Sequence, residues 1–183
     1  MTDTHLDLPE ELLDLPFGSP EFKDANERLA IADMENCVEV SKAMPPWVNV
    51  TGTTVCNLKC FMCNQALDPD IPKWFMSDEV YDSVVRELYP FAKMVQFSAF
   101  GEPLLYKNIE AVLEISKEHC PNVRNETVTD GDFVTPAKLR SLFDAGLDTL
   151  LISLYDGPEQ VEVFQKMMDE VGLSDAQVVL RIR

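Results

Sequence analysis

Three cysteines stand close together in the first half of the chain. Cys56, Cys60 and Cys63 have the spacing C-x3-C-x2-C within residues 55–63, here called the cysteine loop, and they follow an apolar, β-prone segment at residues 47–51. A structural zinc site usually closes with four protein ligands, whereas a four-iron cube held by three cysteines keeps one iron open for a small molecule. The spacing therefore favours a [4Fe-4S] cluster with chemistry at the open iron; a zinc-binding or redox-labile cysteine cluster is the alternative.

The cysteine loop resembles the signature of the radical S-adenosylmethionine (SAM) enzymes, and the resemblance extends over residues 47–183. In that family the three cysteines ligate a [4Fe-4S] cluster, and the open iron binds the amino and carboxylate groups of SAM. Reductive cleavage of SAM then gives a 5′-deoxyadenosyl radical that abstracts hydrogen from the substrate. The residue before the last cysteine is often aromatic in the family and is Met62 here. The resemblance implies that the backbone of Met62 meets the adenine of SAM.

Three further motifs follow the cysteine loop in the family's order. Residues 100–103, Phe-Gly-Glu-Pro, resemble the GGEP motif with Phe in place of the first glycine, which implies that Gly101 and Glu102 contact the SAM amino group. The Thr-Asp-Gly segment that begins at Thr129 occupies the place of the family's Thr/Asn-Asn-Gly turn, so Thr129 is a further expected SAM contact. Residues 151–157 resemble the family's I-S-x-D-G segment with an inserted tyrosine, which implies that Ser153 faces the ribose or carboxylate of SAM.

Apolar runs and helical patterns alternate along the chain from residue 47 onward. Ser77 and Thr135 are typical helix caps, and Pro90 and Gly146 are typical of helix ends. The pattern predicts strands at residues 47–51, 94–100, 123–128, 148–154 and 177–182, with helices that begin near residues 77, 109, 135 and 158. Such alternation predicts parallel βαβ units with right-handed crossovers. We therefore expect an α/β fold, a partial (β/α) radical SAM barrel with about five parallel strands.

The residues singled out above fall at or just beyond the carboxyl ends of successive predicted strands. In (β/α) folds this rim is where ligands bind. Arg181 lies on the last predicted strand between apolar neighbours and could pair with the SAM carboxylate; the alternative is a charge that reaches solvent. The sequence therefore predicts one site built from the cysteine loop, Gly101, Glu102, Thr129, Ser153 and Arg181.

Charge and hydropathy exclude several classes of partner. The chain has 32 acidic and 15 basic residues and a formal net charge of −17, so no nucleic-acid partner is expected, because such partners bind basic patches. It has neither a run of about 18 apolar residues nor the basic and apolar regions of a signal peptide. We therefore expect a cytoplasmic protein without a membrane partner.

Other cysteines and the two histidines contribute little to the predicted site. Five cysteines, three of them clustered, fit a metal site in a reducing compartment better than a disulfide framework. Cys37 and Cys120 are expected to be inert thiols, although Cys37 as an extra ligand is an alternative. Neither His5 nor His119 is expected to act as a catalytic base, because His5 lies near the terminus and His119 ends a predicted helix, where a cation is favoured.

Residues 1–45 are predicted to form an acidic N-terminal leader, and residues 46–183 the radical SAM core. The boundary is placed at two successive prolines, which stop a helix and favour extended backbone. A helix is predicted from about residue 20 to residue 42. A solvated, partly mobile leader is favoured over an acidic docking arm for a basic partner.

Two functional hypotheses remain open from the sequence. In the first, the chain is a radical SAM enzyme. The resemblance implies a small-molecule or peptide substrate and an electron donor such as flavodoxin or ferredoxin. The motifs are most similar to those of family members that carry a C-terminal SPASM-type extension. Since the sequence stops after the fifth predicted strand, without a sixth βα unit, three alternatives are open: the chain is a fragment, a C-terminal domain or partner chain completes the barrel, or the protein is a shortened family member. In the second hypothesis, the chain is a non-catalytic metal- or SAM-binding partial domain that acts as an interaction module.

Overall fold

Five parallel strands form one sheet in the order β1-β2-β3-β4-β5, in the computed structural model, which describes residues 8–68 and 70–183. The strands are β1 (Trp47–Val50), β2 (Met94–Phe97), β3 (Arg124–Thr129), β4 (Thr149–Leu154) and β5 (Val178–Ile182). The helices between them are α3 (Asn64–Leu67), α4 (Asp78–Glu87), the 3-10 turn η1 (Pro103–Leu105), α5 (Ile109–His119), α6 (Pro136–Asp144) and α7 (Gln160–Val171). The predicted α/β fold with five parallel strands is confirmed.

Local signals explain where the helices begin and end. The hydroxyls of Ser77 and Thr135 accept hydrogen bonds from the backbone N–H groups of Val80 and Lys138, and so cap the first turns of α4 and α6. Gly172 ends α7 in the left-handed conformation, which glycine adopts without a steric penalty. These caps fix the lengths of the helices and hence the places where the chain re-enters the sheet.

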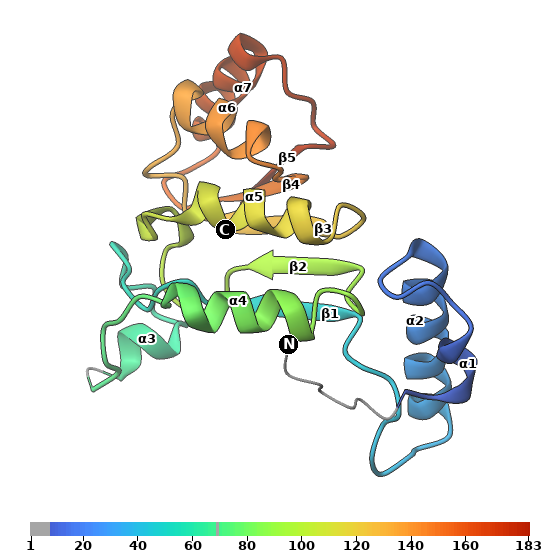
Figure 1. Ribbon diagram of the computed structural model, residues 1–183. Coiled ribbons are helices and arrows are strands. Elements are labelled where there is room, and N and C mark those ends of the chain that lie inside the picture. The colour runs from blue at the N-terminus through green and yellow to red at the C-terminus, as the bar shows by residue number, and fades with distance from the viewer. Residues whose placement is uncertain (1–7, 69) are drawn as a thin grey trace.

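The two faces of the sheet differ in character. Alternate strand residues such as Val48, Val95, Leu150 and Ile152 are buried in a single apolar core with side chains of α4–α7, and Figure 1 shows α4 and α5 on the same side of β1–β3. The strand residues between them point to the other face, because side chains alternate along a strand. That face carries a polar row in which Asn49, Gln96, Glu126 and Thr149 are in register across four strands.

Within the described residues that precede the sheet, the chain forms the helices α1 (Glu10–Leu13) and α2 (Pro20–Glu35). Figure 1 places both beside the amino ends of β1 and β2, whereas α3 lies at the carboxyl ends. The rings of Phe22 and Phe91 are 5.4 Å apart, and Lys93 forms 2.8 Å ion pairs with Asp24 and Glu27. These contacts attach the segment to the core.

The described part of the leader is therefore packed, in contrast to the favoured solvated, partly mobile segment. The helix is also shorter than predicted, because it ends at Glu35 instead of continuing to about residue 42. The proposed domain boundary after residue 45 stays a prediction. Within residues 8–68 and 70–183, no helix is long and apolar enough to cross a membrane.

Candidate functional site

Residues 51–54 connect β1 to the cysteine loop, and two threonines of this connection, Thr53 and Thr54, are held in place by hydrogen bonds. The Thr53 hydroxyl donates a 2.8 Å hydrogen bond to the carbonyl of Trp74, and the Thr54 hydroxyl donates a 2.7 Å hydrogen bond to the carbonyl of Pro72. Both threonines are buried. The segment before α4 therefore fixes the position at which the loop leaves the sheet.

The three cysteines of the loop are free thiols of intermediate burial. The N–H of Cys63 donates to the carbonyl of Cys60 at 2.9 Å, which closes a turn between the second and third cysteine. Burial raises the pKa of the Cys56 thiol, and the nearby carboxylates of Asp130 and Glu102 raise it further. A bound metal centre would offset that effect, since thiolates are stabilised by neighbouring positive charge.

The cysteine side chains of the loop are not arranged around a common point in this structure. In the described ranges, no three Cys, His, Asp or Glu side chains are arranged to hold a metal ion. The loop between the cysteines is exposed, with 83% of Phe61 and 77% of Met62 accessible to solvent. Three free thiols on a nine-residue loop fit a [4Fe-4S] cluster in the chemistry of their donor set.

Gly101 connects the loop after β2 to the cysteine loop. Its φ is +72°, and a Cβ atom there would lie 2.3 Å from the carbonyl oxygen of Thr53 and 2.7 Å from that of Val55. The N–H of Gly101 donates to Oε1 of Gln65 at 2.8 Å, and the N–H of Glu102 donates to the carbonyl of Val55 at 2.9 Å. Only glycine allows this approach of two backbones.

The Glu102 carboxylate is buried, with 3% of the residue exposed, and it joins two strand ends. One oxygen accepts hydrogen bonds from the Thr129 hydroxyl at 2.7 Å and from the Leu104 N–H at 3.0 Å, and the other accepts the Asp130 N–H at 3.0 Å. Burial raises the pKa of Glu102 to about 7. An ionised carboxylate has about four acceptor positions. The three hydrogen bonds from the protein therefore occupy all but about one of them.

Thr129 is the last residue of β3 and contacts the Glu102 carboxylate. Its hydroxyl donates to Glu102 and also accepts the N–H of Gly131 at 3.2 Å. The structure thus brings together the cysteine loop, Gly101, Glu102 and Thr129, as the sequence predicted, but the polar groups of Glu102 and Thr129 largely bind each other. Direct contacts of these side chains with SAM stay predictions.

Ser153 and Arg181 lie opposite each other on β4 and β5. Arg181 is exposed, whereas Ser153 is buried and its hydroxyl accepts a 3.3 Å hydrogen bond from Nε of Arg183. The sequence reasoning missed Arg183; the available signal was the two-residue period of a strand, which predicts Arg181 and Arg183 on one face. The predicted roles of Met62, Ser153 and Arg181 toward SAM stay untested.

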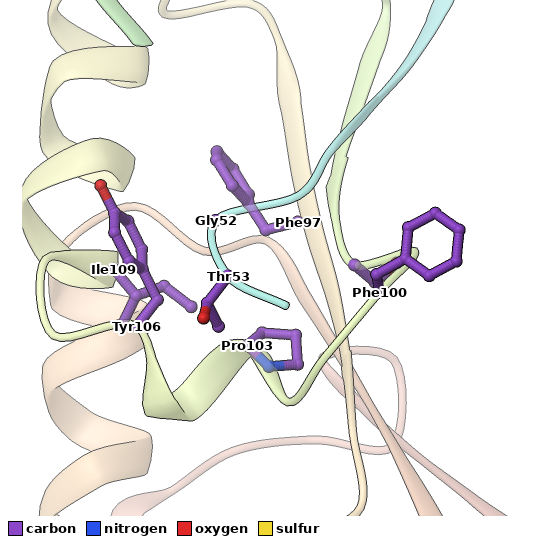
Figure 2. A pocket seen from close by; sticks show the side chains of 8 residues that line it. Gly52, Thr53, Phe97, Phe100, Pro103, Tyr106 and Ile109 are labelled. Carbon is purple, nitrogen blue, oxygen red and sulfur yellow. The ribbon is translucent and has the colours of Figure 1, made fainter. Parts of the chain in front are cut away.

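A small cavity of about 10 Å³ lies beside the site, between the loop after β1 and η1. Figure 2 shows the rings of Pro103 and Tyr106 near Thr53, whereas the ring of Phe100 points away from them. The volume suffices for about one water molecule. Phe100 occupies the position at which the resembled motif has glycine. Its ring fits there because it points toward solvent, and 44% of the residue is exposed.

Cys37, Cys120 and His119 lie outside this arrangement. Cys120 is buried just after α5, and Cys37 is exposed after α2. Both positions precede strands and so belong to the amino-terminal side of the sheet, opposite the cysteine loop. His119 ends α5 as expected, and His5 lies outside the described residues.

Comparison with known proteins places most of the chain in one family. The family model of the radical SAM superfamily matches residues 50–182. A relative from Niallia circulans, the S-adenosyl-L-methionine-dependent 2-deoxy-scyllo-inosamine dehydrogenase, is 25% identical over 135 residues, which are 73% of this chain and 53% of that protein. A probable GTP 3′,8-cyclase from Methanococcus maripaludis is 30% identical over 140 residues, 69% of this chain and 46% of that protein.

The fold is also similar to a solved structure. The crystal structure of BtrN in complex with AdoMet and 2-DOIA aligns with a TM-score of 0.64 and 25% sequence identity, over 75% of this chain and 56% of that chain. The chain spans about half the length of the curated relatives it matches.

Proposed function

Because this chain belongs to the radical SAM superfamily, we propose that it is the core of an enzyme that cleaves SAM reductively and modifies a small polar molecule. One observation carries the proposal. The cysteine loop, with three free thiols, accepts a backbone hydrogen bond from the N–H of Glu102 at Val55, and the Glu102 carboxylate continues the connection to the turn after β3. The connected groups lie at the carboxyl ends of parallel strands, where (β/α) folds bind ligands.

In the proposed mechanism, Cys56, Cys60 and Cys63 would ligate a [4Fe-4S] cluster. When bound, the cluster would supply the electron for reductive cleavage of SAM, which would provide the radical for hydrogen abstraction. The residues of the chain bind and orient. Gly101 allows the β2 loop to approach the cysteine loop closely, and Glu102 keeps the turn after β3 in place.

The substrate proposal rests on the polar row of Asn49, Gln96, Glu126 and Thr149. These four residues are in register on the sheet face opposite the helix-packed core. Four neighbouring strands span about 14 Å, which suits one small molecule with several hydrogen-bonding groups better than a long peptide. The names of the relatives, an inosamine dehydrogenase and a GTP cyclase, agree with this size and polarity, and a peptide is the alternative.

We further propose the partners that such chemistry requires. An electron donor such as flavodoxin or ferredoxin would reduce the cluster, and a reducing compartment such as the cytoplasm would keep the thiols available. A C-terminal domain or a partner chain would continue the sheet at β5, which is an edge strand here.

SAM cleavage tests the proposal without knowledge of the substrate. The protein is reconstituted anaerobically with iron and sulfide, reduced with dithionite and incubated with SAM, and 5′-deoxyadenosine is quantified. We expect 5′-deoxyadenosine from the wild type and from Cys37→Ser, which changes an exposed thiol outside the loop, but none from the Cys56→Ala/Cys60→Ala/Cys63→Ala variant. A cluster-loaded wild type that forms no 5′-deoxyadenosine would favour the non-catalytic binding module.

A further inference from the structure

The turn after β3 contains a carboxylate oxygen without a partner. Asp130 is 9% exposed, and its Oδ1 accepts the N–H of Asp132 at 3.0 Å. Its Oδ2 is buried and has no hydrogen-bond partner among the residues that the structure describes. The side-chain amide of Asn57, in the cysteine loop, donates to Oδ2 of Asp132 at 2.7 Å. Buried polar atoms are nearly always paired, so this oxygen points to a donor that comes from a ligand.

The orphaned oxygen lies within the site described above. The N–H of Asp130 donates to Glu102 at 3.0 Å, so the two carboxylates share one turn. The same turn also contacts the cysteine loop, because Asp132 accepts a hydrogen bond from the side chain of Asn57 at 2.7 Å. Asp130 therefore stands in a turn that is bound both to Glu102 and to the cysteine loop.

The charge of this region favours a cation as the missing donor. Neither Asp130 nor Glu102 forms an ion pair with a basic side chain in the described part of the chain. Burial raises the pKa of both groups, because it disfavours their charged forms. A neutral hydroxyl would satisfy the orphaned oxygen, but an ammonium group would satisfy the oxygen and the charge together.

We propose that Asp130 binds the ammonium group of SAM, with Oδ2 accepting one of its N–H groups. This inference rests on the proposed function and revises one role within it. The sequence assigned the ammonium contact to Glu102, but three acceptor positions of Glu102 are already occupied by protein donors. Asp130 therefore makes the charged contact, and Glu102 is the positioning residue that holds the Asp130 backbone.

A thermodynamic cycle tests this pairing. Calorimetry on anaerobically reconstituted protein measures the affinities of wild type and Asp130→Asn for SAM and for its deaminated analogue, S-adenosyl-4-methylthiobutyrate. We expect Asp130→Asn to reduce the preference for SAM over the analogue by about ten- to a hundredfold, the range for one hydrogen bond to a charged group. Any contact of the amino group with iron is present in both proteins and cancels in the cycle.

Controls separate this contact from folding and from the proposed function. Asp132→Asn removes a negative charge from an exposed position in the same turn and retains a side-chain oxygen that can accept the hydrogen bond from Asn57, so it should keep the wild-type preference. Asp130→Asn should retain the iron content of the wild type and its affinity for the analogue. An unchanged preference in Asp130→Asn, or equal weakening of both ligands, would refute the role of Asp130. A wild type that binds no iron would instead refute the proposed function, and this inference with it.

Discussion

Replacement of Gly101 by alanine tests how closely the β2 loop must approach the cysteine loop. The left-handed φ of +72° at this position costs an alanine about 1–2 kcal/mol. The added Cβ would lie 2.3 Å from the carbonyl oxygen of Thr53 and 2.7 Å from that of Val55, so the backbone must shift, which costs about 1–3 kcal/mol more. We therefore expect Gly101→Ala to lower the free energy of unfolding by about 2–5 kcal/mol.

Gly172→Ala is the matched control for this substitution. Gly172 has a φ of +76°, and an added Cβ there would have no atom within 4 Å. Alanine at this position should therefore cost only the left-handed conformation, about 1–2 kcal/mol. The entropy that alanine removes from the unfolded chain is the same in both variants and cancels. The difference between the variants isolates the steric cost of the contact at Gly101.

Urea unfolding of the cluster-free protein, followed by circular dichroism, measures both changes. A change of 1 kcal/mol corresponds to a melting shift of about 2–4 °C in a chain of this length, so thermal melting gives a second estimate. Equal destabilisation by the two variants would show that the carbonyl groups of Thr53 and Val55 can move away from the added Cβ without a loss of stability. The close approach would then not be what requires glycine at position 101.

The remaining predictions concern Glu102 and its partner. Burial raises the pKa of Glu102 from 4.5 to about 7. Its contribution to the free energy of unfolding is therefore present in full below about pH 4.5 and is lost as the pH rises through about 7. The free energy of unfolding should decrease by about 3 kcal/mol over this range. Urea unfolding across this range should show the decrease, and Glu102→Gln should show a smaller one; equal slopes would contradict the buried carboxylate. Thr129→Val removes the hydroxyl that donates to Glu102 and accepts the Gly131 N–H, so unfolding should become easier by about 1–3 kcal/mol. An unchanged midpoint would show that these two hydrogen bonds contribute nothing.

The sequence predicted the elements of the sheet well because their signals are local. The run at residues 148–154 became β4 (Thr149–Leu154), and Thr135 caps α6 as its position before a proline indicated. Parallel pairing followed from the alternation of strands and helices, which requires crossovers. The same alternation predicted that the cysteine loop and Gly101 meet at one end of the sheet.

The parts that the sequence did not predict depend on contacts between distant residues. Phe22 packs on Phe91 across 69 positions, so no local pattern in the N-terminal segment indicated that this segment attaches to the core. The bond between Glu102 and the backbone of Asp130 spans 28 positions. No local pattern shows that this bond occupies Glu102 and leaves an oxygen of Asp130 unpaired.

Iron and sulfide analysis tests the central claim, that the cysteine loop holds a four-iron cluster with one open position. After anaerobic reconstitution, the wild type and Cys37→Ala should each contain about four irons and four sulfides per chain. The variant without Cys56, Cys60 and Cys63 should contain none and should lack the charge-transfer absorption near roughly 400 nm. Retention of iron by that triple variant would contradict the assignment of the cluster, and loss of iron from Cys37→Ala would show a fourth protein ligand and a closed cluster.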